Sequence, residues 1–203
     1  MLRPLFENSH GKLLPGNQNS DIMVPAGGII MDKGYFQIYT GTGKGKTTAA
    51  LGLTMRAAGA GLSVYIGQFI KSMEYHEIGI LRDRFPEVTV ELYGIEGCIV
   101  NREPDANDKK AAADGLARAA EILMSGSYDI MILDEFFIAM NFGLISEKQA
   151  MDLVDSKAEG TELIMTGRYA PEALIDRADL VTDMNEVRHY WTQGVEARDG
   201  IER

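Results

Sequence analysis

Residues 35–48 read Tyr-Phe-Gln-Ile-Tyr-Thr-Gly-Thr-Gly-Lys-Gly-Lys-Thr-Thr, an apolar run that leads directly into a glycine-rich turn ending in Gly-Lys-Thr. Glycines in such a turn let backbone N–H groups close around phosphate oxygens. Lys46 adds a positive charge, the hydroxyl of Thr47 suits Mg²⁺ or Mn²⁺, and a following helix presents its positive N-terminus to the anion. The stretch therefore predicts a strand, a phosphate-binding loop and a helix, and it indicates that the chain binds a nucleoside triphosphate.

We call residues 40–48 the phosphate-binding loop. The usual pattern G-x-x-x-x-G-K-[ST] begins with glycine, whereas this loop begins with Thr40. A glycine-rich turn without a ligand is the alternative, and the strand before the loop, the apolar helix after it and the Lys-Thr pair argue against that alternative. The residues expected to bind the triphosphate are Gly41, Thr42, Gly43, Lys44, Gly45, Lys46, Thr47 and Thr48.

A second acidic signal follows the apolar run 128–133, where Asp134 and Glu135 stand side by side. Adjacent carboxylates at a strand end cost free energy unless a cation or hydrogen-bond donors offset them. Thr47, Asp134 and Glu135 are therefore the candidate metal ligands, and the sequence leaves open which carboxylate contacts the metal. In a hydrolytic ATPase, Glu135 would orient a water molecule. In a transferase it would bind the metal directly or contact the residues that bind it. The alternative is that the two acids form an ordinary turn after a core strand and bind no metal.

Thr166-Gly167-Arg168 closes another apolar run. The planar guanidinium of Arg168 could clamp phosphate at the same edge of the sheet, or it could form a structural salt bridge. The sequence favours neither.

Short apolar runs alternate with helical patterns from residue 35 onward. This order predicts an α/β fold of the P-loop (RecA-like) kind, with a mostly parallel sheet covered by helices on both faces. We expect a single domain over 34–203, preceded by an irregular N-terminal extension over 1–33, which is rich in proline, glycine and asparagine. The expected strands are 35–40, 63–70, 87–93, 128–134, 161–166 and 179–184, and the expected helices are 46–60, 105–125, one from Ser146 and one over 171–176.

Two faces of these helices are specified by the apolar spacing. In the first helix, one apolar face is expected to hold Ala50, Leu51, Thr54, Met55 and Ala58. In the helix that begins with the capping-box pair Ser146 and Gln149, the buried face is expected to continue to Ala158.

The composition of the chain bears on its partners and on its cellular compartment. The formal net charge is −10, and no cluster of Lys or Arg reaches five residues, which disfavours a nucleic-acid partner. The sole cysteine, Cys98, suits a reducing compartment. The three histidines show no metal-ligand spacing, and neither a signal peptide nor a membrane-spanning run is evident. We expect a cytoplasmic protein with no nucleic-acid or membrane partner.

The loop, the strand-end acids and Thr-Gly-Arg occur in an order and spacing that resemble the ATP:corrinoid adenosyltransferases of the P-loop type. The resemblance runs from about Lys33 to Glu202, and Thr40 is the residue expected in this family at the start of the loop. The matching stretches are 34–52, Gln68-Phe69-Ile70-Lys71, Asn101-Arg102-Glu103, Leu133-Asp134-Glu135, Thr166-Gly167-Arg168-Tyr169-Ala170-Pro171, Ala178-Asp179-Leu180-Val181, Val187-Arg188-His189 and 194–202.

The resemblance implies transfer of the 5′-deoxyadenosyl group from ATP to the Co(I) of a corrinoid, with triphosphate as leaving group. Because Co(I) is itself a strong nucleophile, the protein's work is positioning and the neutralisation of charge on the departing triphosphate. The residues implied in catalysis are Lys46, Thr47 and Glu135. The resemblance also implies a flavoprotein or similar electron donor, and a homodimer is a further expectation.

The chain departs from the family pattern before Asn101. Relatives carry a Phe and a Trp that crowd the lower face of the corrinoid, and Ile95 and Gly97 stand at those positions here. A glycine cannot displace a lower ligand, so the route by which Co(II) becomes reducible stays open. Cys98 is better explained as a small apolar residue than as a cobalt-facing thiol.

Two other functions fit parts of the pattern. A RecA-like ATPase would hydrolyse ATP to drive a partner and would produce ADP and phosphate. A non-catalytic relative would bind corrinoid and ATP without forming an adenosylated product.

Overall fold

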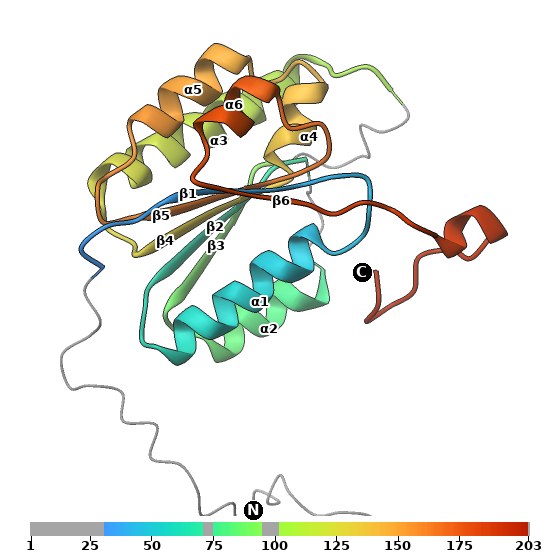
Figure 1. Cartoon of the computed structure of the whole chain (residues 1–203), viewed down its shortest axis with the longest axis horizontal. Coiled ribbons are helices and arrows are strands. Elements are labelled where there is room, and N and C mark those ends of the chain that lie inside the picture. The colour runs from blue at the N-terminus through green and yellow to red at the C-terminus, as the bar shows by residue number, and fades with distance from the viewer. Residues whose placement is uncertain (1–30, 71–74, 95–101, 203) are drawn as a thin grey trace, which may run out of the picture.

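The computed structural model describes residues 31–70, 75–94 and 102–202. Its centre is a six-stranded sheet in the order β3-β2-β4-β5-β1-β6, in which every neighbouring pair is parallel (Figure 1). The strands are β1 (Phe36–Thr40), β2 (Val64–Gln68), β3 (Val88–Leu92), β4 (Ile130–Asp134), β5 (Glu162–Thr166) and β6 (Leu180–Asp183). The six expected strands and the parallel sheet are confirmed.

Helices cover both faces of the sheet, as expected (Figure 1). One face carries α1 (Lys46–Gly59) and α2 (His76–Arg84), and the other carries α3 (Ala106–Ser125), α4 (Phe136–Asn141), α5 (Glu147–Asp155) and α6 (Glu172–Arg177). A short 3-10 helix, η2 (Tyr190–Gln193), lies in the C-terminal segment. The helices α2, α4 and η2 were not expected from the sequence: α4 and η2 are only 6 and 4 residues long, too short to establish a helical period.

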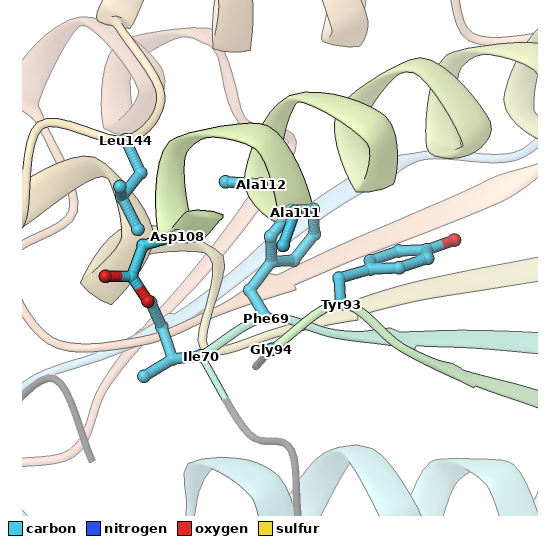
Figure 2. A pocket seen from close by; sticks show the side chains of 8 residues that line it. All are labelled: Phe69, Ile70, Tyr93, Gly94, Asp108, Ala111, Ala112 and Leu144. Atoms are coloured by element: carbon cyan, nitrogen blue, oxygen red, sulfur yellow. The ribbon is translucent and has the colours of Figure 1, made fainter. Parts of the chain in front are cut away.

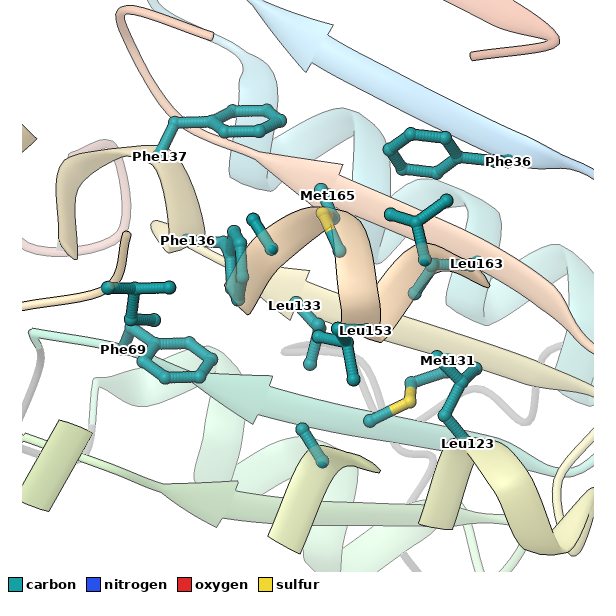
Figure 3. Packing of buried hydrophobic residues seen from close by; sticks show 14 of the residues in the cluster. Phe36, Phe69, Leu123, Met131, Leu133, Phe136, Phe137, Leu153, Leu163 and Met165 are labelled. Atoms are coloured by element: carbon teal, nitrogen blue, oxygen red, sulfur yellow. The ribbon is translucent and has the colours of Figure 1, made fainter. Parts of the chain in front are cut away.

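Alternating side chains of the central strands fill two cores, one on each face. In β4, Met131 and Leu133 pack toward α3 and α5, whereas Ile130 and Ile132 pack toward α1 and α2. Successive side chains of a strand point to opposite faces, so a continuous apolar run is what a strand covered on both sides requires. Figure 3 shows the first core, in which the ring of Phe136 lies edge-on between Phe69 and Phe137.

Two expectations about helix faces need correction. Met55 is 59% exposed, so it does not share the buried face of α1. The buried stripe is Lys46, Ala50, Thr54 and Ala57, and the next residue after Thr54 is rotated by about 100° around the helix axis. The Ser146–Gln149 capping box is confirmed, but α5 ends at Asp155, so Ala158 lies outside it.

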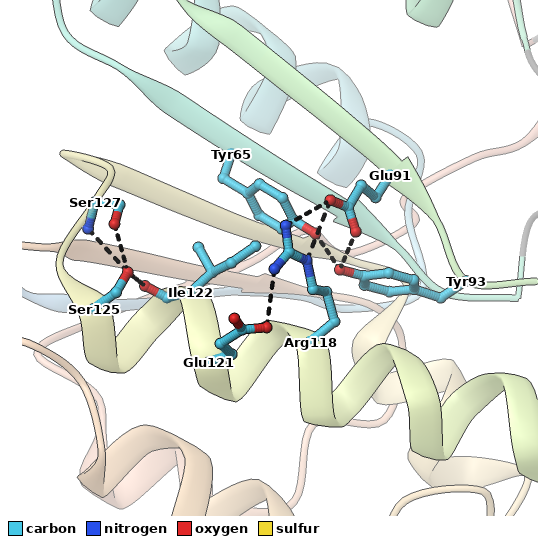
Figure 4. Close-up of polar contacts among 8 residues, drawn as sticks. All are labelled: Tyr65, Glu91, Tyr93, Arg118, Glu121, Ile122, Ser125 and Ser127. Carbon is cyan, nitrogen blue, oxygen red and sulfur yellow. Dashed lines mark hydrogen bonds and ion pairs between the residues drawn. The ribbon is translucent and has the colours of Figure 1, made fainter.

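A polar network joins β2, β3 and α3 (Figure 4). The hydroxyls of Tyr65 and Tyr93 are hydrogen-bonded to each other, and Tyr93 also donates to Glu91 at 3.3 Å. Arg118 of α3 pairs with the same carboxylate at 3.3 Å. Burial raises the pKa of both phenols, which therefore remain neutral donors. The network joins the carboxyl end of β3 to β2 and α3. The phosphate-binding loop follows β1 and lies at the same carboxyl edge of the parallel sheet.

Among the residues the structure describes, no helix is both long and apolar enough to cross a bilayer.

We expect the substitution Gly34→Ala to destabilise the fold by about 3 kcal/mol, because the added methyl group would overlap the backbone carbonyl of Thr161. The backbone is held there on both sides of the contact: Gly34 donates to the carbonyl of Glu159 at 2.7 Å, and Leu163 donates to that of Tyr35 at 2.9 Å. Urea denaturation followed by circular dichroism measures the change.

The matched control is Gly52→Ala on the exposed side of α1, where an added methyl group meets nothing within 4 Å. This substitution should stabilise the protein by about 0.5–1 kcal/mol, because alanine favours a helix over glycine. Equal free energies of unfolding for the two variants would contradict the predicted overlap at Gly34.

Candidate functional site

The phosphate-binding loop connects β1 to α1 at the carboxyl edge of the sheet, where ligands of open α/β sheets bind. Gly41 and Gly45 adopt φ values of 97° and 121°, which residues other than glycine rarely adopt. A methyl group on Gly41 would also overlap the carboxylate of Asp183. The N–H of Gly43 donates to the carbonyl of Met184 at 2.6 Å, so the end of β6 borders the loop.

The C-terminal segment continues this contact along the loop. The N–H of Glu186 donates to the hydroxyl of Thr42 at 3.3 Å, and the ammonium of Lys44 donates to the carbonyl of Ile201 at 2.9 Å. Thr42 and Lys44 thus contact the segment after β6, whereas Thr48 is exposed at the start of α1.

Lys46 is the buried cation of the loop, with 8% of its surface exposed. Its ammonium donates to the carbonyls of Gly41 at 2.8 Å and of Gly43 at 2.6 Å. Burial lowers the pKa of Lys46, and the positive charge of Arg168 lowers it further. A cation held at a cost in hydration is placed to gain strongly from an incoming anion.

Three acids oppose this shift. Glu135, Asp134 and Asp183 each raise the pKa of Lys46 through their negative charge. Arg168 is exposed just beyond the end of β5, at the same carboxyl edge of the sheet as the phosphate-binding loop and Lys46. The structure therefore brings Lys46, Asp134, Glu135 and Arg168 together; a contact between Arg168 and phosphate stays a prediction.

Asp134 is the carboxylate that meets the loop. It is 1% exposed, and its Oδ1 accepts hydrogen bonds from the hydroxyls of Thr47 at 2.9 Å and Thr166 at 2.7 Å. Its Oδ2 accepts from the side-chain amide of Gln68 at 3.1 Å. Three hydrogen-bond donors on one carboxylate fix its direction.

Glu135 occupies a different position from its neighbour. Its backbone is left-handed, with φ 56°, directly before α4, and its N–H donates to the hydroxyl of Thr166 at 3.1 Å. Of the two adjacent acids, the structure joins Asp134, and not Glu135, to the hydroxyl of Thr47.

Sequence reasoning missed Gln68, Thr166 and Asp183 as members of this site. The signal that would have found them is their position, since each is the last residue of a strand. Because the sheet is parallel, the last residues of neighbouring strands meet at one edge. Thr40 and Asp134 end β1 and β4 in the same way.

The oxygen donors of this site fit a hydrated Mg²⁺ or Mn²⁺. The hydroxyl of Thr47 lies beside the carboxylate of Asp134, and such cations are commonly held by one or two side-chain oxygens together with substrate phosphates and water. The part of the chain that the structure describes contains no cluster of three or more His, Cys, Asp or Glu that could hold a metal by itself. A buried oxygen of Gln68 also has no donor among the described residues.

Two candidate corrinoid-facing residues, Ile95 and Gly97, lie outside the described residues, as does Cys98. Among the described residues, a small hollow lies at the ends of β2 and β3, shown in Figure 2. It is lined by Phe69, Ile70, Tyr93, Gly94, Asp108, Ala111, Ala112 and Leu144.

The polar group of this hollow is already paired. Arg102 donates to both oxygens of Asp108, at 2.5 and 3.0 Å, and lowers the pKa of that carboxyl. The pair fixes Arg102, the first described residue after the gap, on the N-terminal turn of α3.

The strand–loop–helix unit, the buried lysine and the Thr47–Asp134 pair on an all-parallel sheet define a P-loop protein of the α/β class. The model of the family ATP:corrinoid adenosyltransferase BtuR/CobO/CobP matches residues 32–203. The chain belongs to the ATP:corrinoid adenosyltransferase family, as the resemblance indicated, and it is an enzyme of the transferase class.

Similar proteins named corrinoid adenosyltransferase occur in several bacteria. The chain is 30% identical over 172 residues to that of Pseudomonas aeruginosa, which covers 84% of each chain. It is 32% identical over 174 residues to that of a Sinorhizobium species, covering 84% of this chain and 81% of the relative. It is 30% identical over 172 residues to that of Escherichia coli K12, covering 84% of this chain and 86% of the relative.

Proposed function

We propose that this protein transfers the 5′-deoxyadenosyl group of ATP to the Co(I) of a corrinoid and releases inorganic triphosphate. Family membership supports adenosylation of a corrinoid. The observation that supports ATP as donor is the convergence of the buried Lys46 with the Thr47–Asp134 pair on the phosphate-binding loop. That arrangement suits a polyphosphate.

In the proposed reaction the electron pair of Co(I) forms the cobalt–carbon bond at C5′ while the bond from C5′ to the triphosphate oxygen breaks. The triphosphate leaves with the electron pair of the broken C5′–O bond, so negative charge grows on it. Lys46 and the N–H groups of the loop would neutralise this charge. No nucleophilic side chain is needed, and the remaining task of the chain is to hold C5′ in line with cobalt.

Thr47 and Asp134 are the residues that would hold a divalent cation beside the triphosphate, and Glu135 would lie just outside them. A bound Mg²⁺ or Mn²⁺ would supply further positive charge to the departing oxygens. Arg168, at the same edge, would pair with phosphate oxygens through its planar guanidinium. Gly41, Thr42, Gly43, Lys44, Gly45 and Thr48 complete the proposed loop contacts.

The direct test combines the protein with ATP, Mg²⁺ and chemically reduced cobalamin. We expect the visible spectrum of an adenosylated corrinoid, with one triphosphate released for each product formed. ADP and phosphate in place of triphosphate would instead support a RecA-like ATPase. Binding of both substrates without product would indicate a non-catalytic relative.

The proposal extends to the corrinoid side of the reaction through the resemblance. A flavoprotein or similar reductase would supply the electron to Co(II), and Ile95 and Gly97 would face the corrinoid. Cytoplasmic activity as a homodimer is part of the same proposal, and sedimentation of the purified protein tests the oligomeric state.

Introducing an aromatic side chain with Gly97→Trp should raise the rate of adenosylation that starts from Co(II) plus reductant, by restoring bulk at a position where relatives crowd the lower face. The rate that starts from chemically prepared Co(I) should change less, because no reduction is then required. Parallel assays from the two oxidation states measure the difference. Equal changes in both would mean that this segment does not govern reduction.

A further inference from the structure

The backbone of Gln68 is fixed at the end of β2, beside Asp134 on the neighbouring strand β4. Its side chain is completely buried, and its Cα is the register partner of Asp134. Its backbone carbonyl accepts from the N–H of Tyr93 at 2.8 Å, and the next N–H, of Phe69, donates to the carbonyl of Asp134 at 2.9 Å. Hydrogen bonds to both neighbouring strands therefore fix the starting point of the side chain.

The orientation of the Gln68 amide follows from its partner. A carboxylate offers acceptor oxygens, and the amide nitrogen of Gln68 faces that of Asp134 at 3.1 Å. This orientation leaves Oε1 as an acceptor. Among the described residues this buried oxygen has no hydrogen-bond donor. A buried acceptor without a donor costs free energy, and a bound water or ion is one of the features that explain such an atom in folded proteins.

The other hydrogen-bond donors of the candidate site have partners of their own. The hydroxyls of Thr47 and Thr166 both donate to Asp134. The ammonium of Lys46 donates to two carbonyls of the loop. Among the described residues none supplies a donor to this oxygen. Water bound to a cation is a strong hydrogen-bond donor, and its position would be set by Thr47 and Asp134.

We propose that Oε1 of Gln68 accepts a hydrogen bond from a water molecule on the divalent cation that accompanies ATP, which makes Gln68 a positioning residue for the metal–nucleotide complex. This inference rests on the proposed function for the identity of the ligand. Through one amide, Gln68 would orient both the carboxylate that holds the cation and a water on that cation.

The test compares Gln68→Met with Gln37→Met. Methionine has nearly the same volume as glutamine and removes both polar atoms. Gln37 is a matched control in β1: its amide donates to Glu162 at 2.5 Å, and its oxygen accepts from Tyr39 at 2.8 Å, so it is a glutamine bound to a carboxylate with both ends satisfied. The affinity for Mn²⁺ in the presence of ATP is measured by electron paramagnetic resonance, and the affinity for metal-free ATP by calorimetry.

We expect Gln68→Met to weaken Mn²⁺ binding in the presence of ATP by about tenfold or more, because residues that contact bound waters typically affect metal affinity by 10–100-fold. Metal-free ATP should bind within about twofold of the wild-type affinity, and Gln37→Met should leave both affinities unchanged. Unchanged Mn²⁺ affinity in a folded Gln68→Met variant would overturn the proposal.

Gln68→Glu keeps an acceptor oxygen at the same distance, but it replaces the donor to Asp134 with a carboxylate oxygen and adds a negative charge beside that acid. It is the second variant and is measured also if Gln68→Met does not fold. We expect it to bind Mn²⁺ with ATP more tightly than Gln68→Met, or within about threefold of the wild type if it is measured alone. Equal weakening in both variants, or a tenfold loss in Gln68→Glu alone, would assign Gln68 a purely structural contact with Asp134. Because these measurements need no corrinoid, wild-type protein that binds Mn²⁺ and ATP but forms no product would contradict the proposed function and leave this inference standing.

Discussion

Lys46→Ala should lower the rate of adenosyl transfer about a thousandfold, even when chemically reduced Co(I) corrinoid is supplied. Removing one preorganised charge from the site of a developing anion typically costs a factor of 10² to 10³. Lys46 is buried, and its pKa is lowered chiefly by that burial, so the cation has little water to lose when the triphosphate arrives. The rate is measured from the visible spectrum with Co(I) already present, which removes the reduction step from the assay.

The control for Lys46→Ala is Lys148→Ala. Lys148 is exposed on α5, where it pairs with Asp152, so its removal alters the net charge equally without touching the phosphate-binding loop. Wild-type rates in Lys46→Ala would remove the loop from the chemistry and with it the proposed role of ATP.

Asp134→Asn should reduce adenosyl transfer about a hundredfold and weaken Mg²⁺ binding to a similar extent, because it removes the carboxylate beside Thr47 without changing its shape. The effect on stability should be below about 1 kcal/mol. The Gln68 amide can rotate so that its oxygen accepts from the new asparagine nitrogen, and the hydroxyls of Thr47 and Thr166 can keep donating to the oxygen they already share.

The comparison variant is Glu135→Gln, assayed under the same conditions. We expect a smaller loss of transfer than in Asp134→Asn, because the hydroxyl of Thr47 contacts Asp134. If Glu135→Gln were the more damaging change and triphosphate gave way to ADP and phosphate, a water-activating role for Glu135 would replace the present assignment. Mg²⁺ titrations of the two variants separate loss of metal from loss of catalysis.

The sheet was predictable because its signals are local and strong. Runs such as Ile130–Leu133 are too apolar for a strand that has one face exposed to solvent. The glycine-rich turn after residue 39 is typical of phosphate binding. Short helices were harder to predict. The helix α4 follows Glu135, whose backbone is left-handed, directly after β4, and apolar spacing does not indicate such a backbone conformation.

The candidate site was predicted in part for a related reason. Lys46 and Thr47 lie within one motif, so the sequence shows them together. Gln68 and Thr166 reach Asp134 only through the strand order β2-β4-β5, which the sequence does not state. For the same reason the choice between Asp134 and Glu135 required the contact with Thr47.

The position of β1 between β5 and β6 has a consequence for synthesis on the ribosome. β1 (Phe36–Thr40) is made first, yet both of its partners come from the last part of the chain, with registers such as Ile38 to Met165 and Ile38 to Val181. Parallel pairing across such separations is slow to form. The nascent chain must therefore carry the phosphate-binding loop without the partner strands of β1 until β5 and β6 have been made. Chaperones that shield emerging hydrophobic segments should raise the yield of folded protein.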